Sequence, residues 1–326
     1  MDNDIFYDTG GVNVSGARIR CWKAGGHGSQ TYLQVVENSC NTGFVSLGFK
    51  LGKDKLFDYI KKFGFGSKTG VDLNGEENGI LFKLDKVGDL ELATTSFGQG
   101  VSVTPIQQIV AVSAAINGGY LMKPYIVKSL NEPVTNTVIK ENKPVIVRKV
   151  ISDETSSKVR YALENVVANG TGRNAYIENY RVGGKTGTAQ KVKNGTYMVG
   201  NYIVSFIGFL PSDDPEVIVY IAIDHPQGIV QYGGSVSAPI AREVLMDSIS
   251  ALKIKPKSGL IKKYNWNDKK GYLLEDVVGL DVNDAIKKLK HFKVEYSGNG
   301  NKVVYMSPKS GTRLLEGSTI KLMIGE

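Results

Sequence analysis

The sequence contains few of the residues that cross-link chains or bind metals, with two cysteines and three histidines among 326 residues. So few cysteines exclude a disulfide-rich scaffold. Long apolar runs are also missing. The longest, Val217 to Ile223, is far below the roughly 18 residues of a transmembrane helix. The acidic start, with Asp2 and Asp4, lacks the apolar segment of a signal peptide. Thirty-eight glycines show no G-X-Y period, which excludes collagen.

Charge of one sign is not strongly in excess, because 40 Lys and Arg face 32 Asp and Glu, a net charge of +8. The basic residues are scattered, and no basic helix, zinc-finger spacing or RNA-binding signature accompanies them, so we expect no nucleic-acid partner. We interpret the surplus as a solvated surface or as attraction to anionic cell-envelope material. The 41% hydrophobic and 22% charged residues exclude wholesale disorder.

Residue patterns predict an α+β fold in the first 250 residues. Apolar spacing and capping residues predict helices over 31–44, 54–63, 104–116, 152–167 and 237–252. Alternation and turn residues predict strands over 181–191, 202–210 and 216–224. Helices followed by a meander of strands and a last helix favour an antiparallel sheet covered by helices.

The length suggests about two domains. We place the first at residues 1–252 and interpret the polar, Lys-rich segment 253–271 as a linker. Residues 272–326 form the second, a small αβ unit with a helix over 282–291. Its strands are predicted near 292–296, 302–306 and 319–324.

The tetrapeptide Lys185-Thr186-Gly187-Thr188 carries most chemical information. On a strand, Thr186 and Thr188 share one face and, with the lysine beside them, form an edge suited to a carboxylate. Gly187 lets a ligand approach the backbone, and the N–H of Thr188 could face a developing oxyanion. A second copy, Lys68-Thr69-Gly70, lies in a Gly-rich stretch, and we predict that it is a structural turn.

Ser39-Cys40-Asn41 lies in the first predicted helix. Positions i and i+2 of a regular helix do not face the same way, so Ser39 and Asn41 meet at one cleft only if the helix ends or turns there. Gly43 makes such a turn plausible. Taken alone, an S-x-N sequence is far more often a cap or a turn than a catalytic motif.

Together the two motifs are more specific, because S-x-N followed after roughly 145 residues by K-T-G is two thirds of a known three-part signature. Gly170-Thr171-Gly172 and the stretch from Thr94 to Gly100 also fit. From about residue 5 to 252 the chain resembles the transpeptidase domain of class B penicillin-binding proteins. Residues 272–326 resemble a PASTA module, through Val278-Gly279 and Glu316-Gly317-Ser318 among others, although Met306-Ser307 stands where this module often has a glutamine.

The resemblance implies a peptidoglycan D,D-transpeptidase, of the kind that acts in spore cortex or septal wall synthesis, which cross-links stem peptides by acyl transfer from D-Ala-D-Ala. It implies that Ser39 relays a proton, that Asn41 holds the substrate amide and that Lys185 supports Ser39. Thr186, Gly187 and Thr188 would bind the substrate carboxylate. Expected partners are stem peptides, β-lactams and other cell-wall synthesis proteins, at the extracytoplasmic face of the membrane.

The first part of the signature, S-x-x-K with the acylated serine, does not precede Ser39. The strings Ser250 to Lys253 and Ser318 to Lys321 follow the K-T-G and are interpreted as chance. We therefore expect a fragment that begins just after the nucleophile and is inactive alone, with a membrane anchor only in the full-length protein. A non-catalytic β-lactam or peptidoglycan sensor is the main alternative. A β-lactamase is disfavoured by the long S-x-N to K-T-G spacing and the C-terminal module.

Cys21, His27 and Cys40 fall within twenty residues of one another, which is a concentrated set of metal-binding side chains. A structural zinc ion, a disulfide and two unligated thiols remain alternatives from the residues alone. Resemblance to class B relatives that carry zinc at matching positions favours the first, with Asp8 as a candidate fourth ligand. No organic cofactor is expected.

Overall fold

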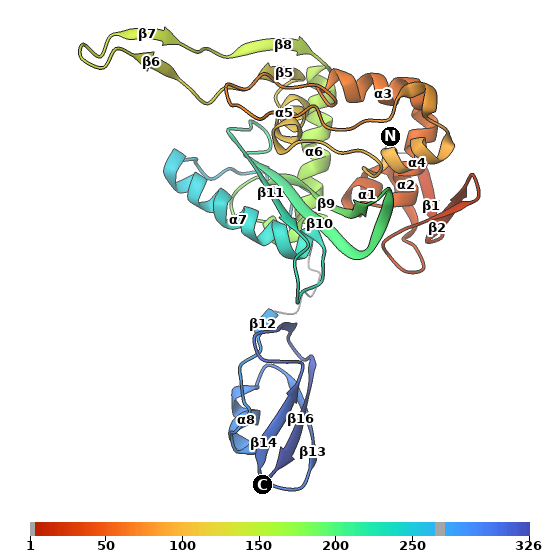
Figure 1. The fold of residues 1–326 in the computed structure, drawn as a ribbon, viewed down its shortest axis with the longest axis vertical. Coiled ribbons are helices and arrows are strands. Elements are labelled where there is room, and N and C mark those ends of the chain that lie inside the picture. Colours follow the sequence, from red (N-terminus) through yellow and green to blue (C-terminus); the bar gives the residue numbers. More distant parts are fainter. Residues whose placement is uncertain (1–3, 265–270) are drawn as a thin grey trace. The chain divides into compact units, whose positions relative to one another are not determined.

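A computed structural model describes residues 4–264 and 271–326. Two units can be distinguished, residues 1–225 with 231–263 and residues 226–230 with 264–326, and each is described by itself. Figure 1 labels the elements of both units. The predicted domain limits at 252 and 272 remain a prediction, and residues 265–270 of the predicted linker lie outside the described residues. No helix among the described residues has the length and apolarity needed to span a bilayer.

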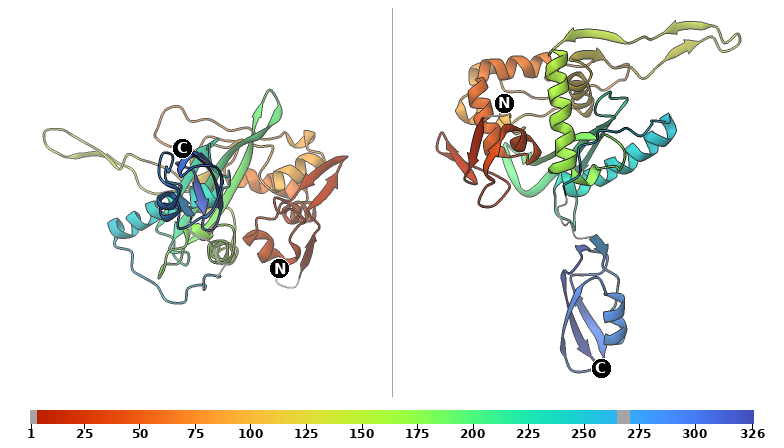
Figure 2. Two further views of the ribbon diagram at one scale, coloured as in Figure 1. Left: turned by 90° about the horizontal axis from the view of Figure 1, so that it is seen from below. Right: turned by 180° about the vertical axis from the view of Figure 1, so that it is seen from behind.

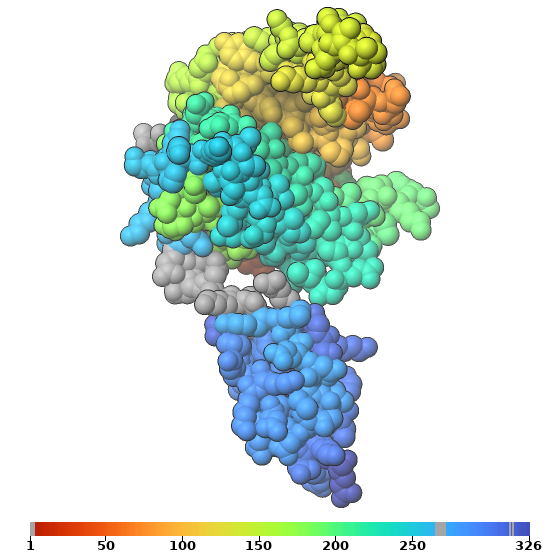
Figure 3. Space-filling view, turned by 90° about the vertical axis from the view of Figure 1, so that its left-hand side faces the viewer, coloured from red at the N-terminus to blue at the C-terminus, as the bar shows by residue number. Residues whose placement is uncertain are grey.

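The centre of the first unit is a three-stranded antiparallel sheet in the order β11-β10-β9. Its strands are β9 (Gly183–Lys193), β10 (Thr196–Leu210) and β11 (Val217–Asp224), as the strand predictions expected, with β10 longer than predicted. The turn at Asn194 and Gly195 has positive φ at both residues, which suits a tight hairpin. The hairpin tip stands out from the body in Figure 3.

Helices cover both faces of this sheet (Figures 1 and 2). Alternation directs the even-numbered residues of β10, such as Phe206 and Leu210, toward α7 (Gly233–Leu252), where they form the main core with Ala241 and Leu245. The odd-numbered residues face α5 (Pro105–Ile116) and α6 (Asp153–Asn169). The first residue of each predicted range, Thr104 or Ser152, is the N-cap. Its hydroxyl accepts a hydrogen bond from the backbone N–H of the residue three positions later.

The prediction of a single helix over 31–44 is wrong. The chain instead forms α1 (Tyr32–Glu37) and α2 (Asn41–Leu51), because Ser39 between them has φ +50° and breaks the helical path. The next helices are α3 (Lys53–Lys62), the short η1 (Leu84–Lys86) and α4 (Asp89–Ser96). A single turn, η2 (Arg173–Ala175), leads from α6 toward β9.

Small antiparallel ribbons that the sequence patterns did not predict complete the unit. Near the N-terminus β1 (Ile5–Asp8) pairs with β4 (Gly28–Thr31), and β2 (Gly11–Val14) pairs with β3 (Ala17–Arg20). A long hairpin follows α5. In it β5 (Tyr120–Lys123) pairs with β8 (Val145–Lys149), and β6 (Ser129–Asn131) pairs with β7 (Val138–Glu141).

Within its described residues, the second unit contains one helix and two small sheets. Helix α8 (Val282–Lys288) ends earlier than predicted, and the larger sheet has the order β13-β16-β14. Its strands are β13 (Lys293–Gly298), β14 (Lys302–Ser307) and β16 (Thr319–Gly325), and β12 (Gly271–Leu273) pairs with β15 (Arg313–Leu315). Leu274, Ala285, Leu289 and Ile320 are buried in its core, so this small unit has a hydrophobic core of its own.

Candidate active site

Ser39 and Lys185 meet although 146 residues separate them in the chain. The Lys185 ammonium donates to the Ser39 hydroxyl over 2.6 Å and to the carbonyl of Thr186 over 2.9 Å. Burial lowers the pKa of Lys185 to about 8. A serine held in the left-handed region beside a half-buried lysine is strained and polarised, which is typical of functional sites.

Thr186 and Thr188 lie on one face of β9, as the alternation predicts. The Thr186 hydroxyl is 3.0 Å from the hydroxyl of Thr171, and the Thr188 hydroxyl accepts from the N–H of Gly233 over 3.3 Å. Gly233 is the first residue of α7, a helix of 20 residues. The positive end of that helix therefore lies beside the hydroxyl row, an arrangement suited to a carboxylate.

Thr171 is a further site residue. The sequence patterns assigned no role to it, although its Gly-Thr-Gly motif fits the family. Its N–H donates to the carbonyl of Glu37 over 3.0 Å, and its hydroxyl lies 3.3 Å from the same carbonyl. Because Glu37 ends α1 just before Ser39, Thr171 connects the serine segment to the K-T-G strand.

Glycines make this connection possible. A Cβ on Gly170 would lie 2.3 Å from the Glu37 carbonyl oxygen, and one on Gly234 would lie 2.3 Å from that of Thr171. A Cβ on Gly187 would meet the hydroxyl of Ser205, its partner on β10, at 2.4 Å. The predicted approach of a ligand to the backbone of Gly187 stays a prediction. Backbone segments thus touch directly around the site.

Asn41 does not join this constellation in the structure. Its side-chain amide donates to the carbonyl of Arg20 over 3.0 Å, so its hydrogen bond is made with the last residue of β3. The residue begins α2, directly after the break that positions Ser39. Its predicted contact with a substrate amide stays a prediction.

The second Lys-Thr-Gly copy is a loop, as predicted. The carboxylate of Glu76 accepts from the N–H and the hydroxyl of Thr69, each over 2.5 Å, and from the N–H of Gly70 over 3.0 Å. The threonine hydroxyl is therefore occupied by its own loop and cannot serve a ligand.

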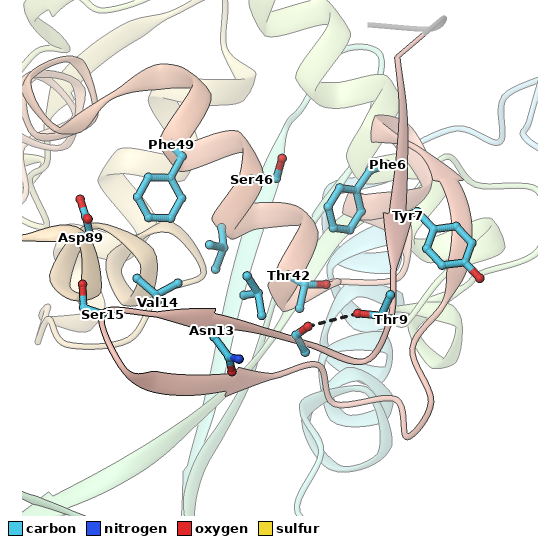
Figure 4. A pocket seen from close by; sticks show the side chains of 13 residues that line it. Phe6, Tyr7, Thr9, Asn13, Val14, Ser15, Thr42, Ser46, Phe49 and Asp89 are labelled. Atoms are coloured by element: carbon cyan, nitrogen blue, oxygen red, sulfur yellow. Dashed lines mark hydrogen bonds between the residues drawn. The ribbon is translucent and has the colours of Figure 1, made fainter.

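Two cavities flank these elements. One of about 250 Å³ is lined by Lys185, Thr186 and Gly187 and by residues of α5 and β10, so it belongs to the candidate site. A larger one, about 480 Å³, is lined by residues of β1, β2 and α2. Figure 4 shows Thr42, Ser46 and Phe49 of α2 and Asn13 of β2 around it. We place the chemistry beside the smaller cavity, because its lining includes Lys185 of the Ser39–Lys185 pair, whereas the lining of the larger one includes neither residue.

Asp8, Cys21, His27 and Cys40 converge on one point, and their ligand atoms all lie within 4.8 Å of one another. Both cysteines are free thiols with their Sγ atoms 3.8 Å apart, so the disulfide alternative is not what the structure contains. Burial opposes ionisation of Asp8, but bonds from Gly10, His27 and Thr42 hold its pKa well below the usual range. The hydrogen bond from Cys21 lowers the pKa of Cys40 to about 6 and raises that of Cys21.

Comparison with known families agrees with this geometry. Residues 1–246 match the family model of the penicillin binding protein transpeptidase domain. The chain belongs to the penicillin-binding protein transpeptidase family. Residues 272–326 match the PASTA domain, so the chain carries a PASTA unit after its transpeptidase-family domain.

Relatives of this chain include Stage V sporulation protein D of Bacillus subtilis strain 168. The two are 58% identical over 327 residues, which cover all of this chain and 51% of that protein. PbpB of Mycolicibacterium smegmatis is 32% identical over 74% of this chain and 39% of its own length. The chain therefore spans about half, or less, of the length of these curated relatives.

Solved structures show the same fold. The transpeptidase domain of Burkholderia pseudomallei penicillin-binding protein 3 has a TM-score of 0.69 and 29% identity, over 78% of this chain and 74% of that one. Penicillin-binding protein 3 of Mycobacterium tuberculosis has a TM-score of 0.72 and 27% identity, over 81% and 61%. That mycobacterial protein has also been solved in complex with aztreonam and with ampicillin.

Proposed function

We propose that this chain supplies the substrate-binding and proton-handling half of a peptidoglycan D,D-transpeptidase that acts in spore cortex or septal wall synthesis. The observation that carries the proposal is the 2.6 Å contact between Lys185 and Ser39, which joins the S-x-N and K-T-G motifs at one site. Similarity over the whole chain to Stage V sporulation protein D supports the sporulation setting.

The proposed reaction has two acyl-transfer steps. The serine of an S-x-x-K, which this chain does not supply before Ser39, attacks the carbonyl of the penultimate D-Ala. The amide bond breaks, and the terminal D-Ala leaves as an amine that has gained a proton. An amine of a second stem peptide then attacks the ester, an amide forms, and the serine recovers its proton.

Within this reaction the residues described above bind and move protons. Lys185 keeps the Ser39 hydroxyl oriented, so that Ser39 can pass a proton to the leaving amine. The hydroxyls of Thr186 and Thr188, with the start of α7, receive the terminal carboxylate. Asn41 would hold the substrate amide after releasing the carbonyl of Arg20.

The proposed partners are stem peptides, β-lactams that imitate them and other proteins of cell-wall synthesis. The proposed setting is the extracytoplasmic face of the membrane, where the substrate lies. Family membership and the β-lactam complexes of the M. tuberculosis relative support the choice of ligands.

A labelling experiment tests the function. The chain is compared with a chimera in which it replaces the matching segment of B. subtilis Stage V sporulation protein D. We expect a fluorescent penicillin to label the chimera covalently and to leave the chain alone unlabelled. A chimera that binds penicillin reversibly without acylation would favour the non-catalytic sensor, and a denaturation-resistant label on the chain alone would refute the expected inactivity.

We further propose that Asp8, Cys21, His27 and Cys40 hold a structural zinc ion. Tetrahedral coordination at ordinary zinc–ligand bond lengths sets two sulfur ligands about 3.8 Å apart and a sulfur and a nitrogen about 3.5 Å apart. The corresponding distances are 3.8 Å between the two cysteines and 3.4 Å between Cys21 Sγ and His27 Nδ1. Two thiols, an imidazole and a carboxylate are a donor set that suits zinc.

When bound, zinc would add four strong cross-links between β1, the loop before β4 and the start of α2. Because Cys40 follows Ser39 directly, these residues would fix the position of the serine. Metal analysis of the purified chain should give about one zinc per chain, and Cys21→Ser should lower both the zinc content and the thermal midpoint. Two titratable thiols with no zinc would refute this proposal without touching the transpeptidase proposal.

A further inference from the structure

The hairpin after α5 extends away from the rest of the first unit. We call residues 120–149, which include β5, β6, β7 and β8, the arm. Figure 1 shows β7 and β8 along the upper border of the arm, and Figure 2 shows the same protruding hairpin from behind. The arm forms none of the contacts described for the Ser39–Lys185 site, so the proposed reaction leaves its role open.

The arm is ordered at both ends by hydrogen bonds. At its base the Asp72 carboxylate accepts from the N–H groups of Ile126 and Val127 over 2.7 and 2.9 Å, and Arg148 donates to the carbonyl of Lys62 over 2.9 Å. At its tip Glu132 accepts from Val134 over 2.9 Å and from the Thr135 hydroxyl over 2.8 Å. A ribbon fixed in this way presents one defined surface.

The middle of the arm exposes apolar side chains on both faces. Every residue of β7 and β8 is exposed, although alternate residues of a strand point to opposite sides. Ile139 is 69% exposed and Ile146 is 58% exposed. Val138, Val145 and Val147 are exposed as well. Several large apolar side chains exposed to water on two successive strands are typical of an interaction surface.

The arm also has a free strand edge. β7 pairs with β6 and β8 pairs with β5, so β7 and β8 follow one another along the same side of the hairpin. Within the described residues, neither has a strand on its other side. Unpaired N–H and C=O groups of an exposed edge pair readily with an added strand.

Charge indicates which strand the edge accepts. The arm has six Lys or Arg residues and two Glu residues, a net charge of +4. Glu132 is occupied by the tip, and Glu141 is exposed between Lys140 and Lys143. The two lysines are exposed and have no ion pair with the described residues, so positive charge predominates along this edge. A second copy of the chain would bring the same positive charge to the same edge. A bilayer core would leave the edge's polar groups without partners.

We propose that the β7–β8 edge of the arm is a docking site for an extended, acidic and apolar segment of a partner protein. The segment adds a strand along residues 138–149, packs its apolar side chains on Ile139 and Ile146, and sets its carboxylates beside Lys140 and Lys143. Main-chain bonds supply affinity and the lysines supply selectivity.

Binding of synthetic peptides to the 326-residue chain tests the proposal. The probe is a fluorescent peptide of alternating Glu and Val, about twelve residues long, which spans the edge. We expect it to bind in an anisotropy titration and a Lys–Val counterpart not to bind. N-methylation of alternate residues removes donors from one peptide edge, so one methylation register should abolish binding and the other should preserve it.

Protein variants locate the site. Ile139→Thr with Ile146→Thr, and separately Lys140→Glu with Lys143→Glu, should each weaken binding at least about tenfold, equivalent to about 1.4 kcal/mol. Matched controls are Val199→Thr, which is 91% exposed on the β9–β10 hairpin, and Lys55→Glu with Lys61→Glu on α3. These should bind as the parent does.

Three results would overturn the proposal. The first is equal binding of the acidic and the basic peptide, or equal binding of the two peptides that are N-methylated in alternate registers. The second is self-association of the chain in sedimentation that the arm variants remove, which would assign the edge to a second copy. The third is arm-dependent pelleting with phosphatidylglycerol vesicles, which would assign it to a membrane surface.

Discussion

Two copies of Lys-Thr-Gly occur in one chain, and they have opposite environments. Thr69 and Gly70 bond to Glu76 inside an exposed loop, whereas Lys185 is half-buried against Ser39 and Thr186 lies beside Thr171. The three residue types are the same in both places. The difference shows that the chemistry comes from what the strand and its neighbours bring to the motif, since a tripeptide alone also makes a turn.

The largest expected effect is on the rate of acylation, and it should distinguish Lys185 from Lys68. In the chimera described above, Lys185→Met should lower the rate of acylation by a fluorescent penicillin at least about a hundredfold, because the support for Ser39 is lost. Lys68→Met should leave that rate within about twofold of the parent. Equal losses in both variants would contradict the assignment of the site to the second motif.

A smaller effect is expected for the threonine that joins the two motifs. Thr171→Val removes the hydroxyl next to Thr186 and should slow acylation of the chimera about tenfold, an effect of about 1.4 kcal/mol. Thr171→Ser keeps the hydroxyl and should restore most of the rate. Thr69→Val, the matched change in the loop copy, should lower stability without changing the rate. Failure of serine to rescue would indicate a packing role for Thr171.

The half-buried lysine should also give the chain a pH-dependent stability. Below pH about 8 Lys185 is charged in both the folded and the unfolded chain, so the cost of burying the ammonium is fully present. Between pH about 8 and the ordinary value of 10.5, the folded chain loses the proton first. The free energy of unfolding should therefore rise with pH in this window, relative to Lys185→Met.

Urea denaturation at several pH values measures this difference. Lys68→Met serves as the control, because it removes a lysine from the exposed copy and should run parallel to the parent across the same window. Parallel curves for the parent and Lys185→Met would indicate that the ammonium is solvated in the folded chain.

The smallest effect on the rate of acylation should come from the loop copy, whose changes should alter stability alone. Glu76→Ala removes three hydrogen bonds that close the loop and should cost roughly 1 to 2 kcal/mol, which corresponds to a few degrees in the thermal midpoint. Acylation of the chimera should not change. A loss of rate without a loss of stability would give this loop a part in catalysis.

The sequence patterns predicted the elements that carry strong local signals. Thr104 with Pro105 defines the start of α5, and alternation with a proline-rich turn defines β10 and β11. The sequence patterns did not predict the end of α1 at Glu37, because the apolar spacing continues through Ser39. The positive φ of Ser39 depends on tertiary contacts. The arm was also missed, since its exposed Val and Ile residues show no single-faced pattern.

The sequence motifs predicted which residue types form the candidate site. The remaining site residues are brought in by contacts between distant parts of the chain. Lys185 and the threonine row follow from the motif, and the metal-binding group follows from Cys21, His27 and Cys40 near one another in sequence. Thr171 and the N–H of Gly233 could not be assigned, because their partners lie on other elements. The orientation of Asn41 toward Arg20 likewise depends on the fold of the β2–β3 ribbon.

The glycines that let backbones touch around the site also restrict how its sequence can change. At Gly170 and Gly234 even a methyl group would lie 2.3 Å from a carbonyl oxygen, so a single substitution there has to move a whole segment. Under selection, natural variants should therefore accumulate where side chains already face open space, such as the tip of the β9–β10 hairpin. A survey of natural variants should find substitutions at the exposed positions around the site and none at these glycines. That contrast would locate the site without any assay.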